Sequence, residues 1–276
     1  MAAPTKIKRF TTPDRLFHVA LLVTFITQTI TGLGRLYFPT SWGKSVCSLF
    51  GGYESTTSVH IWVGIFMIAV FLVHVVYALT RVLWRGGKAG LSNPDYLTPS
   101  FRDLRQWWQS LRCLFGRGEH PHFDRWTFWE KFDYWAVFWG MIILGGTGLI
   151  LAFPVAASNL VPGWMLSVAL LVHRLEAILA IIHIFLIHFL MTHFRPAAFP
   201  LDDSIFSGYS DLGREMAERP AWLDRLKQEG RLEESLGEAP SARARITYCV
   251  FGYLVMVTCF YFLFCLFFYL PTVKWF

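Results

Sequence analysis

The sequence predicts an all-α membrane protein, built as a bundle of five transmembrane helices. Of its 276 residues, 54% are hydrophobic, 17% are aromatic and only 16% are charged, and the mean hydropathy is +0.42. A soluble domain of this length carries more charge. Five apolar stretches are also close to the length of about 20 residues that a helix needs to cross a bilayer. We therefore expect one membrane domain over residues 1–276, with spans at about 16–36, 59–83, 134–153, 166–191 and 246–270.

Lysine and arginine are distributed unevenly among the segments outside these spans. The N-terminal arm and segments 84–133 and 192–245 carry many of them, whereas 38–58 has only Lys44 and 154–167 has none. Because positively charged loops remain on the cytoplasmic side, the N-terminus and both charged segments are predicted to be cytoplasmic and the C-terminus outside. The net charge of +6 therefore does not indicate nucleic-acid binding, because the distribution of these charges is explained by orientation in the bilayer. We expect no nucleic-acid partner.

The two cytoplasmic segments are predicted to contain helices of their own. In the first, apolar residues recur at helical spacing between polar ones, at positions Phe101, Leu104, Trp108, Leu111 and Phe115. This pattern indicates an amphipathic helix in the headgroup region, or alternatively one packed on a soluble partner. The second segment mixes both signs of charge and is predicted to form a short surface helix around Glu215–Glu234. The fifth span has no histidine and is interpreted as a scaffold or lipid-facing helix.

Pairs of histidines lie within the second and fourth spans, where imidazoles are costly and rare. His60 and His74 are fourteen residues apart, which is about 21 Å along a helix and about 40° around it. His173 and His188 are fifteen residues apart, about 22 Å and 60°. Both spans run from outside to inside, so His60 and His173 share the outer depth and His74 and His188 the inner depth.

Two histidine pairs at matching depths predict two stacked b haems, because haem iron takes one imidazole from each side of the macrocycle. The sequence has no CxxCH motif for covalent attachment. The outer haem is assigned to His60 and His173. For the inner haem, His188 has two candidate partners, His74 and His18, and His18 lies at the cytoplasmic edge of the first span. Axial rise alone does not separate these two candidates.

Haem propionates need cationic neighbours near each membrane surface. Arg35 and Arg174 are suitably placed outside, and Arg15 and Arg81 inside, although arginines at helix ends also extend to the interface without any ligand. Small residues allow a flat macrocycle or a neighbouring helix to approach the backbone closely. Such residues lie in the first three spans at Gly32, Gly64, Gly145, Gly146 and Gly148.

Four sequence motifs resemble those of a bacterial cytochrome b family. They are RFTTPDRLFH, VHIWVGIFMIAVFLVH, EKFDYWAVFWGMIILGGTGLILAFP and HRLEAILAIIHIFLIHFLMTHFRPAAFPLD. The family includes the gamma subunit of formate dehydrogenase and the cytochrome b of membrane-bound nickel-iron hydrogenase. The chain looks most similar to a branch associated with multihaem c-type cytochromes. The resemblance covers about residues 9–202.

The resemblance implies a set of haem ligands and a function. The ligands would be His18, His60, His173 and His188, with His18 opposite His188 and His74 as the alternative inner ligand. The chain departs from the family pattern in three ways. It has a histidine at His74, a fifteen-residue spacing between the two histidines of the fourth span, and an additional fifth span. The implied function is electron transfer between membrane menaquinone or ubiquinone and a redox partner. That partner would be a multihaem c-type cytochrome, a periplasmic oxidoreductase, or an iron-sulfur or other redox subunit of a membrane complex.

A quinone site is expected at the cytoplasmic edge, beside the inner haem. A quinone exchanges protons with water while its tail stays in lipid, and its carbonyl oxygens need donors or bases nearby. Polar groups concentrate at this edge, and His193, Arg195 and Asp133, with His74 as a further candidate, are predicted to line the site. The alternative is that the THFRP sequence caps the helix and anchors a propionate.

Two other classes of function are compatible with intramembrane histidines. A proton or ion transporter with a histidine relay would also have acidic residues along its helices, but only Glu176 lies deep in a span. A haem-containing membrane anchor of a soluble enzyme is the other alternative. His183 faces away from both ligand pairs and is interpreted as a packing residue. In every case we expect a multi-pass protein of the bacterial or archaeal cytoplasmic membrane.

Overall fold

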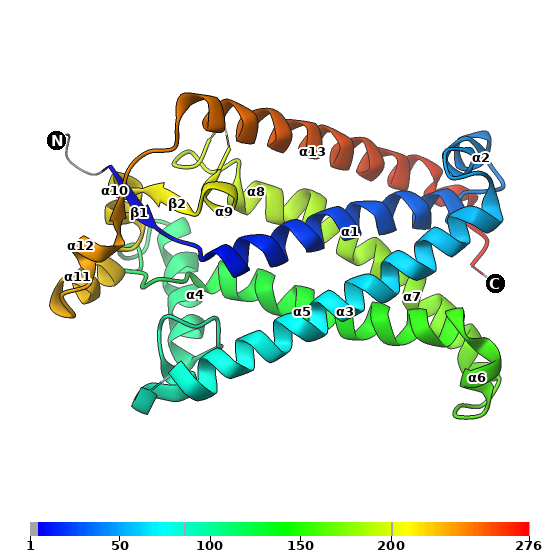
Figure 1. The fold of residues 1–276 in the computed structure, drawn as a ribbon, viewed down its shortest axis with the longest axis horizontal. Coiled ribbons are helices and arrows are strands. Elements are labelled where there is room, and N and C mark those ends of the chain that lie inside the picture. Colours follow the sequence, from blue (N-terminus) through cyan, green and yellow to red (C-terminus); the bar gives the residue numbers. More distant parts are fainter. Residues whose placement is uncertain (1–4, 86, 200, 276) are drawn as a thin grey trace. The chain divides into compact units, whose positions relative to one another are not determined.

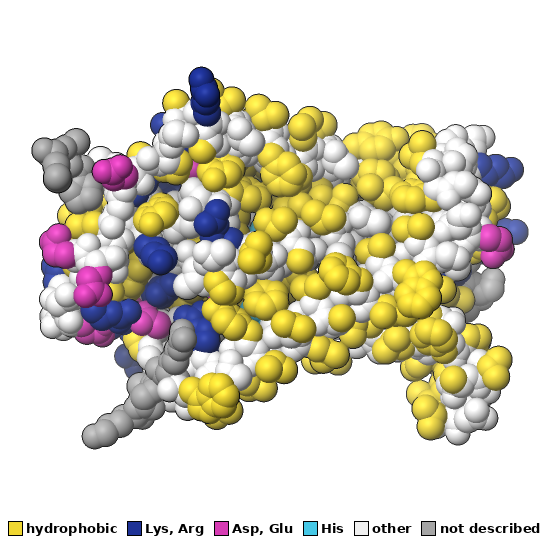
Figure 2. Space-filling view, viewed as in Figure 1, with side chains coloured by type: hydrophobic (Ala, Val, Ile, Leu, Met, Phe, Trp, Pro, Cys, Tyr) yellow, Lys and Arg dark blue, Asp and Glu magenta, His cyan; other side chains and the backbone are white. Residues whose placement is uncertain are grey.

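A computed structural model describes residues 5–85, 87–199 and 201–275. Within these ranges five helices are long and apolar enough to cross a membrane, as predicted (Figure 1). Hydrophobic side chains cover most of the long helices on the face shown in Figure 2. The membrane helices are α1 Thr12–Leu36, α3 Tyr53–Arg85, α5 Phe128–Ala152, α7 Trp164–Ile182 with its continuation, and α13 Ala242–Tyr269.

The chain forms two compact units. The first, which we name the membrane unit, consists of Leu16–His74, Val137–Thr192 and Phe251–Phe276. The second, the charged unit, consists of Met1–Arg15, Val75–Ala136 and His193–Val250. The membrane unit also contains the short helices α2 Ser41–Ser48, α6 Pro154–Ser158 and η3 Leu270–Thr272.

The fourth membrane helix changes its winding partway along. After α7 the chain forms one π-helical turn, η2 His183–His188, and then returns to α-helix in α8 Phe189–Thr192. A π turn accommodates an extra residue in a helix and is frequently found at functional sites. The turn begins at one histidine and ends at another, so it changes the direction in which His188 points relative to His173.

Helix α13 packs within the membrane unit through its C-terminal half. The Tyr37 hydroxyl donates a 2.7 Å hydrogen bond to the carbonyl of Leu266, and the Trp42 indole donates one of 2.9 Å to the Tyr261 hydroxyl. The ring of Trp42 also stacks on Tyr269 with centroids 5.4 Å apart. Membrane helices associate through such packing and interhelical hydrogen bonds. The fifth helix is therefore tied to the region around α2.

The charged unit contains a small antiparallel sheet of three short strands. Strand β1 (Lys6–Lys8) lies between β2 (Tyr209–Asp211) and β3 (Leu236–Gly237), with Ile7 opposite both Ser210 and Leu236. The same unit also contains the amphipathic helix α4 (Phe101–Leu114), predicted from the sequence, the 3-10 turn η1 (Gly87–Ser92) and the short helices α9 (Ser204–Ser207), α10 (Leu212–Glu218), α11 (Pro220–Gln228) and α12 (Leu232–Ser235).

The expected single helix around residues 215–234 is instead three helices, and it is not confined to the surface. Pro220 has no backbone N–H and begins a new helix at its first turn, while Gly230 has a positive φ of 67° that ends α11. Trp222, Leu223 and Leu226 pack against Ile7 in a core beneath β1. The amino-terminal strand and α11 therefore stabilise one another.

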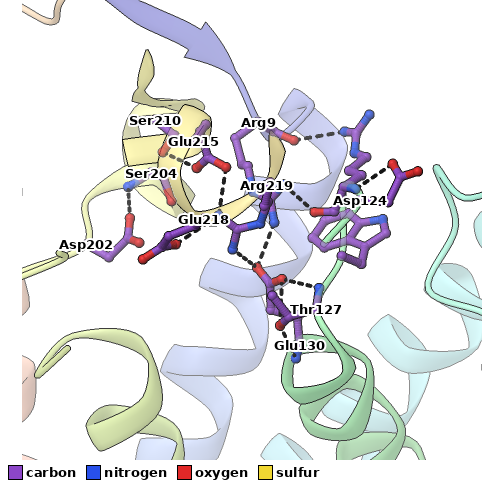
Figure 3. Close-up of polar contacts among 12 residues, drawn as sticks. Arg9, Asp124, Thr127, Glu130, Asp202, Ser204, Ser210, Glu215, Glu218 and Arg219 are labelled. Atoms are coloured by element: carbon purple, nitrogen blue, oxygen red, sulfur yellow. Dashed lines mark hydrogen bonds and ion pairs between the residues drawn. The ribbon is translucent and has the colours of Figure 1, made fainter. Parts of the chain in front are cut away.

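Buried ion pairs connect this core to the start of α5 (Figure 3). The Glu130 carboxylate accepts a hydrogen bond of 2.7 Å from Arg9 and one of 3.1 Å from Arg219. Arg219 also forms an ion pair with Glu215 at 2.7 Å. Burial alone would raise the pKa of the Glu215 carboxyl, but Arg9, Arg219 and the Ser210 hydroxyl hold it below its ordinary value. Buried charges persist only when they are paired and hydrogen-bonded in this way.

Candidate functional site

The outer histidines face each other inside the membrane unit. His60 comes from α3 and His173 from α7, and the centroids of their rings are 6.4 Å apart with ring planes at 78°. An imidazole nitrogen binds a transition metal at about 2 Å, with the ring centre about 1 Å farther back, so two imidazoles on opposite sides of one iron have centres roughly 6 Å apart. The observed separation fits a haem iron between them.

Each of these two rings has a hydroxyl partner on a neighbouring helix. The Nδ1 atom of His60 lies 2.8 Å from Oγ1 of Thr31 on α1, and Nδ1 of His173 lies 2.9 Å from Oγ1 of Thr147 on α5. A hydrogen-bond partner of this kind orients a metal ligand and fixes which ring nitrogen is protonated. With Nδ1 engaged in both rings, the Nε2 atoms are the ones suited to bind iron.

A glycine follows each of these threonines and lies against the same imidazole. A Cβ atom built on Gly32 would come within 3.3 Å of Cε1 of His60, and one on Gly148 within 3.3 Å of Cε1 of His173. Gly64 and Gly145 have a different role, because their missing side chains make room for Gln28 and Ile68 of neighbouring helices. Four of the five glycines noted in the sequence therefore divide between imidazole seating and helix packing, while a Cβ atom on Gly146 would meet nothing within 4 Å.

Two arginines of the membrane unit belong to the predicted propionate set. Arg35 lies over the ring of Tyr53 at 5.9 Å, and its buried Nε has no hydrogen-bond partner among the described residues. Arg174 donates a long 3.4 Å bond to the carbonyl of Lys274. A buried guanidinium N–H normally has an acceptor, so Arg35 fits a site for an anionic group such as a propionate.

All three candidates for the inner haem, His18, His74 and His188, lie in the membrane unit. The ring of His74 is surrounded by aromatic groups, with the Phe17 ring at 4.9 Å and the Phe138 ring at 6.4 Å, both edge-on. His188 ends the π turn, which absorbs one of the fifteen residues after His173. The remaining fourteen α-helical steps bring the two histidines to about 40° around the axis rather than 60°.

Three residues predicted near a quinone, His193, Arg195 and Asp133, lie in the charged unit, whereas the further candidate His74 belongs to the membrane unit. His193 is buried, and its Nδ1 accepts a 3.2 Å hydrogen bond from the backbone N–H of Asp202. Arg195 pairs with Glu218 at 3.0 Å. Asp133 lies on the first turns of α5.

The two arginines expected on the inner side also have partners within the charged unit. Arg15 donates to the carbonyl of Phe206, and Arg81 pairs with Asp14 at 3.5 Å.

Comparison with known proteins shows the family of this chain. The model of the family described as prokaryotic cytochrome b561 matches residues 9–200. The chain belongs to this family. It is also 25% identical over 185 residues to the formate dehydrogenase cytochrome b556(fdo) subunit of Escherichia coli strains K12, O6:H1 and O157:H7. That match covers 66% of this chain and 76% of the relatives.

Membership of the cytochrome b561 family establishes the general class of the protein. It is a b-type membrane cytochrome that takes part in electron transfer, and a multi-pass protein of the bacterial inner membrane. Family membership also implies that the chain binds haem b. When bound, haem supplies a reversible one-electron centre, and the protein supplies its ligands, orientation and electrostatic environment.

The two threonines are not among the residues predicted from the sequence. Their signal in the sequence is a Thr-Gly pair repeated in the first and third spans, at Thr31–Gly32 and Thr147–Gly148. Threonine is common in membrane helices, where its hydroxyl bonds to the preceding turn, so the pair is not distinctive by itself. Only the packing of α1 on α3 and of α5 on α7 reveals the contacts with His60 and His173.

Proposed function

We propose that this protein holds two b haems and carries electrons between a membrane quinone and a redox partner. The observation that carries the proposal is the outer histidine pair, in which two imidazoles face each other at 6.4 Å with both Nδ1 atoms engaged by hydroxyls. His60 and His173 hold the outer haem, and Arg35 and Arg174 interact with its propionates. With the N-terminus in the cytoplasm, this haem lies near the outer surface.

The inner haem is bound by His18 and His188, with Arg15 and Arg81 as its propionate partners. Two features support His18 over His74. The family resemblance implies a ligand at the His18 position, and the His74 ring packs edge-on against Phe17 and Phe138. If His18 is the ligand, His18→Ala removes one haem and His74→Ala retains both, as counted by haem extraction. Retention of both haems in His18→Ala, with loss of one in His74→Ala, would reverse the assignment.

The quinone, a menaquinone or ubiquinone, binds at the cytoplasmic end of the fourth span, lined by His193, Arg195 and Asp133. His193 follows the inner ligand His188 by five residues, which supports rapid electron exchange there. Its imidazole is held by the backbone N–H of Asp202, so its position is fixed. An imidazole held in this way is suited to exchange a proton with a quinone carbonyl oxygen.

Quinol-driven haem reduction tests this function. Stopped-flow mixing of the purified protein with a short-chain quinol should reduce both haems, and His193→Ala should slow the reduction while leaving haem content unchanged. His122→Ala is the matched control, because His122 is an exposed histidine of the same unit. Equal reduction rates in His193→Ala and wild type, with a quinone-analogue inhibitor still effective, would place the quinone elsewhere.

The redox partner is a c-type cytochrome or an iron-sulfur or other redox subunit. The E. coli relatives are named as subunits of formate dehydrogenase, which supports assembly of this chain with a redox subunit. Purification of a tagged chain in mild detergent, followed by a stain for covalently bound haem, distinguishes the partner classes. Stoichiometric covalent haem indicates a c-type cytochrome, and its absence together with stoichiometric iron-sulfur absorption indicates the other class.

A further inference from the structure

The hydroxyls of Thr31 and Thr147 each have a second bond that determines which group donates to the histidine. Thr31 Oγ1 lies 2.7 Å from the carbonyl of Thr27, and Thr147 Oγ1 lies 2.6 Å from that of Ile143. A hydroxyl has one hydrogen, and a carbonyl can only accept. The threonine hydrogen is therefore donated to the helix backbone, and the oxygen accepts the remaining contact.

It follows that the histidine is the donor in both pairs. Nδ1–H of His60 donates to Thr31, and Nδ1–H of His173 donates to Thr147, at 2.8 and 2.9 Å. In a neutral imidazole the other nitrogen then carries the lone pair. The two hydroxyls therefore select the tautomer whose Nε2 is available to a metal.

The glycines leave the space that each ring occupies. The hydroxyl engages Nδ1, while a Cβ atom added at Gly32 or Gly148 would come within 3.3 Å of the adjacent ring atom Cε1. The hydroxyl contact opposes rotation of the imidazole about its Cβ–Cγ bond, and the missing side chain lets the ring keep that orientation. The 78° angle between the two ring planes is thus set by two different helices, α1 for one ring and α5 for the other.

We propose that Thr31 and Thr147 are positioning residues for the axial ligands, fixing the tautomer and plane of His60 and His173 and thereby the redox potential of the outer haem. This inference rests on the proposed function, which makes those histidines ligands. A hydroxyl that accepts from Nδ1–H makes the imidazole a stronger electron donor, because it draws the proton partly away. A stronger donor stabilises ferric iron and lowers the midpoint potential.

The angle between the ring planes provides an independent spectroscopic readout. Nearly perpendicular imidazole planes leave two d orbitals of ferric iron close in energy, so the wild-type outer haem should give a strongly anisotropic low-spin EPR signal. Loss of a hydroxyl frees one ring to turn, which separates those orbitals and reduces the anisotropy. A residue that only packs the helices would not change this signal.

The experiment compares Thr31→Val and Thr147→Val with the corresponding Thr→Ser variants in the full-length protein. Valine keeps the shape and removes the acceptor, whereas serine keeps the hydroxyl. Potentiometric titration should show the midpoint of one haem rising in each valine variant, with the ferrous-to-ferric ratio at the wild-type midpoint increasing about threefold to tenfold. Tenfold corresponds to about 59 mV for a one-electron couple. Serine should restore the wild-type midpoint and EPR signal.

Thr24→Val is the matched control. Thr24 is buried on the same helix as Thr31, and among the described residues its hydroxyl bonds only to the backbone, at 2.7 Å from the carbonyl of Ala20 and 3.1 Å from that of Leu21. Its substitution should leave both midpoints and the EPR signal unchanged.

Three results would overturn the inference. The first is wild-type potentials and spectra in both Thr31→Val and Thr147→Val. The second is loss of the haem in the Thr→Ser variants as well as in the Thr→Val variants, which would show that packing, and not the hydroxyl, matters. The third is an equal shift in Thr24→Val. A wild-type chain without two b haems would instead refute the proposed function, so the two failures are distinguishable.

Discussion

At the scale of single residues, the site depends on small groups beside the histidines as much as on the histidines themselves. The placement of His60 and His173 at one depth was predictable, because 1.5 Å and 100° per residue set the position of each histidine within its own span. The hydroxyls and glycines that hold their rings come from other helices. No sequence period relates residues on separate helices, so these contacts appear only once the helices are packed.

Gly148→Ala tests the seating of the outer ligand. The new Cβ would lie 3.3 Å from Cε1 of His173, so the ring must move, and we expect the affinity for the outer haem to fall about tenfold. Gly146→Ala is the control, because a Cβ there meets nothing within 4 Å. Haem retention during dialysis against apomyoglobin measures the affinity. Equal retention in the two variants would contradict the role of Gly148.

Arg219→Ala tests the buried ion pairs of the charged unit. Arg219 is 3% exposed and pairs with the buried Glu215 and the half-buried Glu130, so its removal leaves the carboxylate of Glu215 partly uncompensated. We expect a loss of about 3–5 kcal/mol in the free energy of opening of this unit. Lys227→Ala, at an exposed surface pair with Asp224, should change it by less than about 0.5 kcal/mol. Native-state hydrogen exchange of amides in α10 and α11 measures both, and similar losses would count against the network.

At the scale of elements, hydropathy and helical periodicity predicted the five long helices and α4, because each has a strong apolar period or length signal. The small sheet of the charged unit was missed. Strand β1 has only three residues, and its partners lie about two hundred positions later in the chain. Neither hydrophobic alternation nor a turn signal links such distant segments. The π turn was missed for a related reason, because a single extra residue leaves the apolar pattern of the fourth span nearly unchanged.

Deletion of Leu186 tests the π turn. Leu186 lies within the turn and is 37% exposed, so its loss should convert the segment to regular α-helix with fourteen residues between His173 and His188. The direction of His188 is then preserved, and we expect both haems to be retained. Insertion of one alanine after Leu186 should rotate His188 by about 100° and remove the inner haem. Retention of both haems in the insertion variant would show that the winding is unimportant.

At the scale of the whole molecule, the two units depend on different interactions. The membrane unit holds the histidine pairs, threonines and glycines, whereas the charged unit holds the dense ion pairs. In the charged unit, burial alone would raise the pKa values of the Asp95 and Asp202 carboxyls. Neighbouring guanidinium groups outweigh this effect, so both pKa values lie below their ordinary range. These groups belong to Arg225, Arg125 and Arg231 beside Asp95 and to Arg214 beside Asp202.

These lowered pKa values predict acid sensitivity of the charged unit. A carboxyl whose pKa is lower in the folded state contributes stability above its unfolded pKa, and this contribution is lost as pH falls toward the folded value. Protection of β1 and α11 in hydrogen exchange, corrected for intrinsic rates, should therefore be constant from pH 7 to 5 and decrease below about pH 4. Asp224→Asn, at an exposed carboxyl, should follow the same curve. A loss of protection already between pH 7 and 5 would be inconsistent with these carboxylates.

The central claim is that two b haems are held by histidine pairs, the outer one by His60 and His173. The most direct test is the amount of haem b per chain, measured by the pyridine haemochrome method, in wild type and in His173→Ala, with His183→Ala as a control from the same helix. We predict two haems per wild-type chain, one in His173→Ala and two in His183→Ala. A single haem in wild type, or two haems remaining in His173→Ala, would contradict the account.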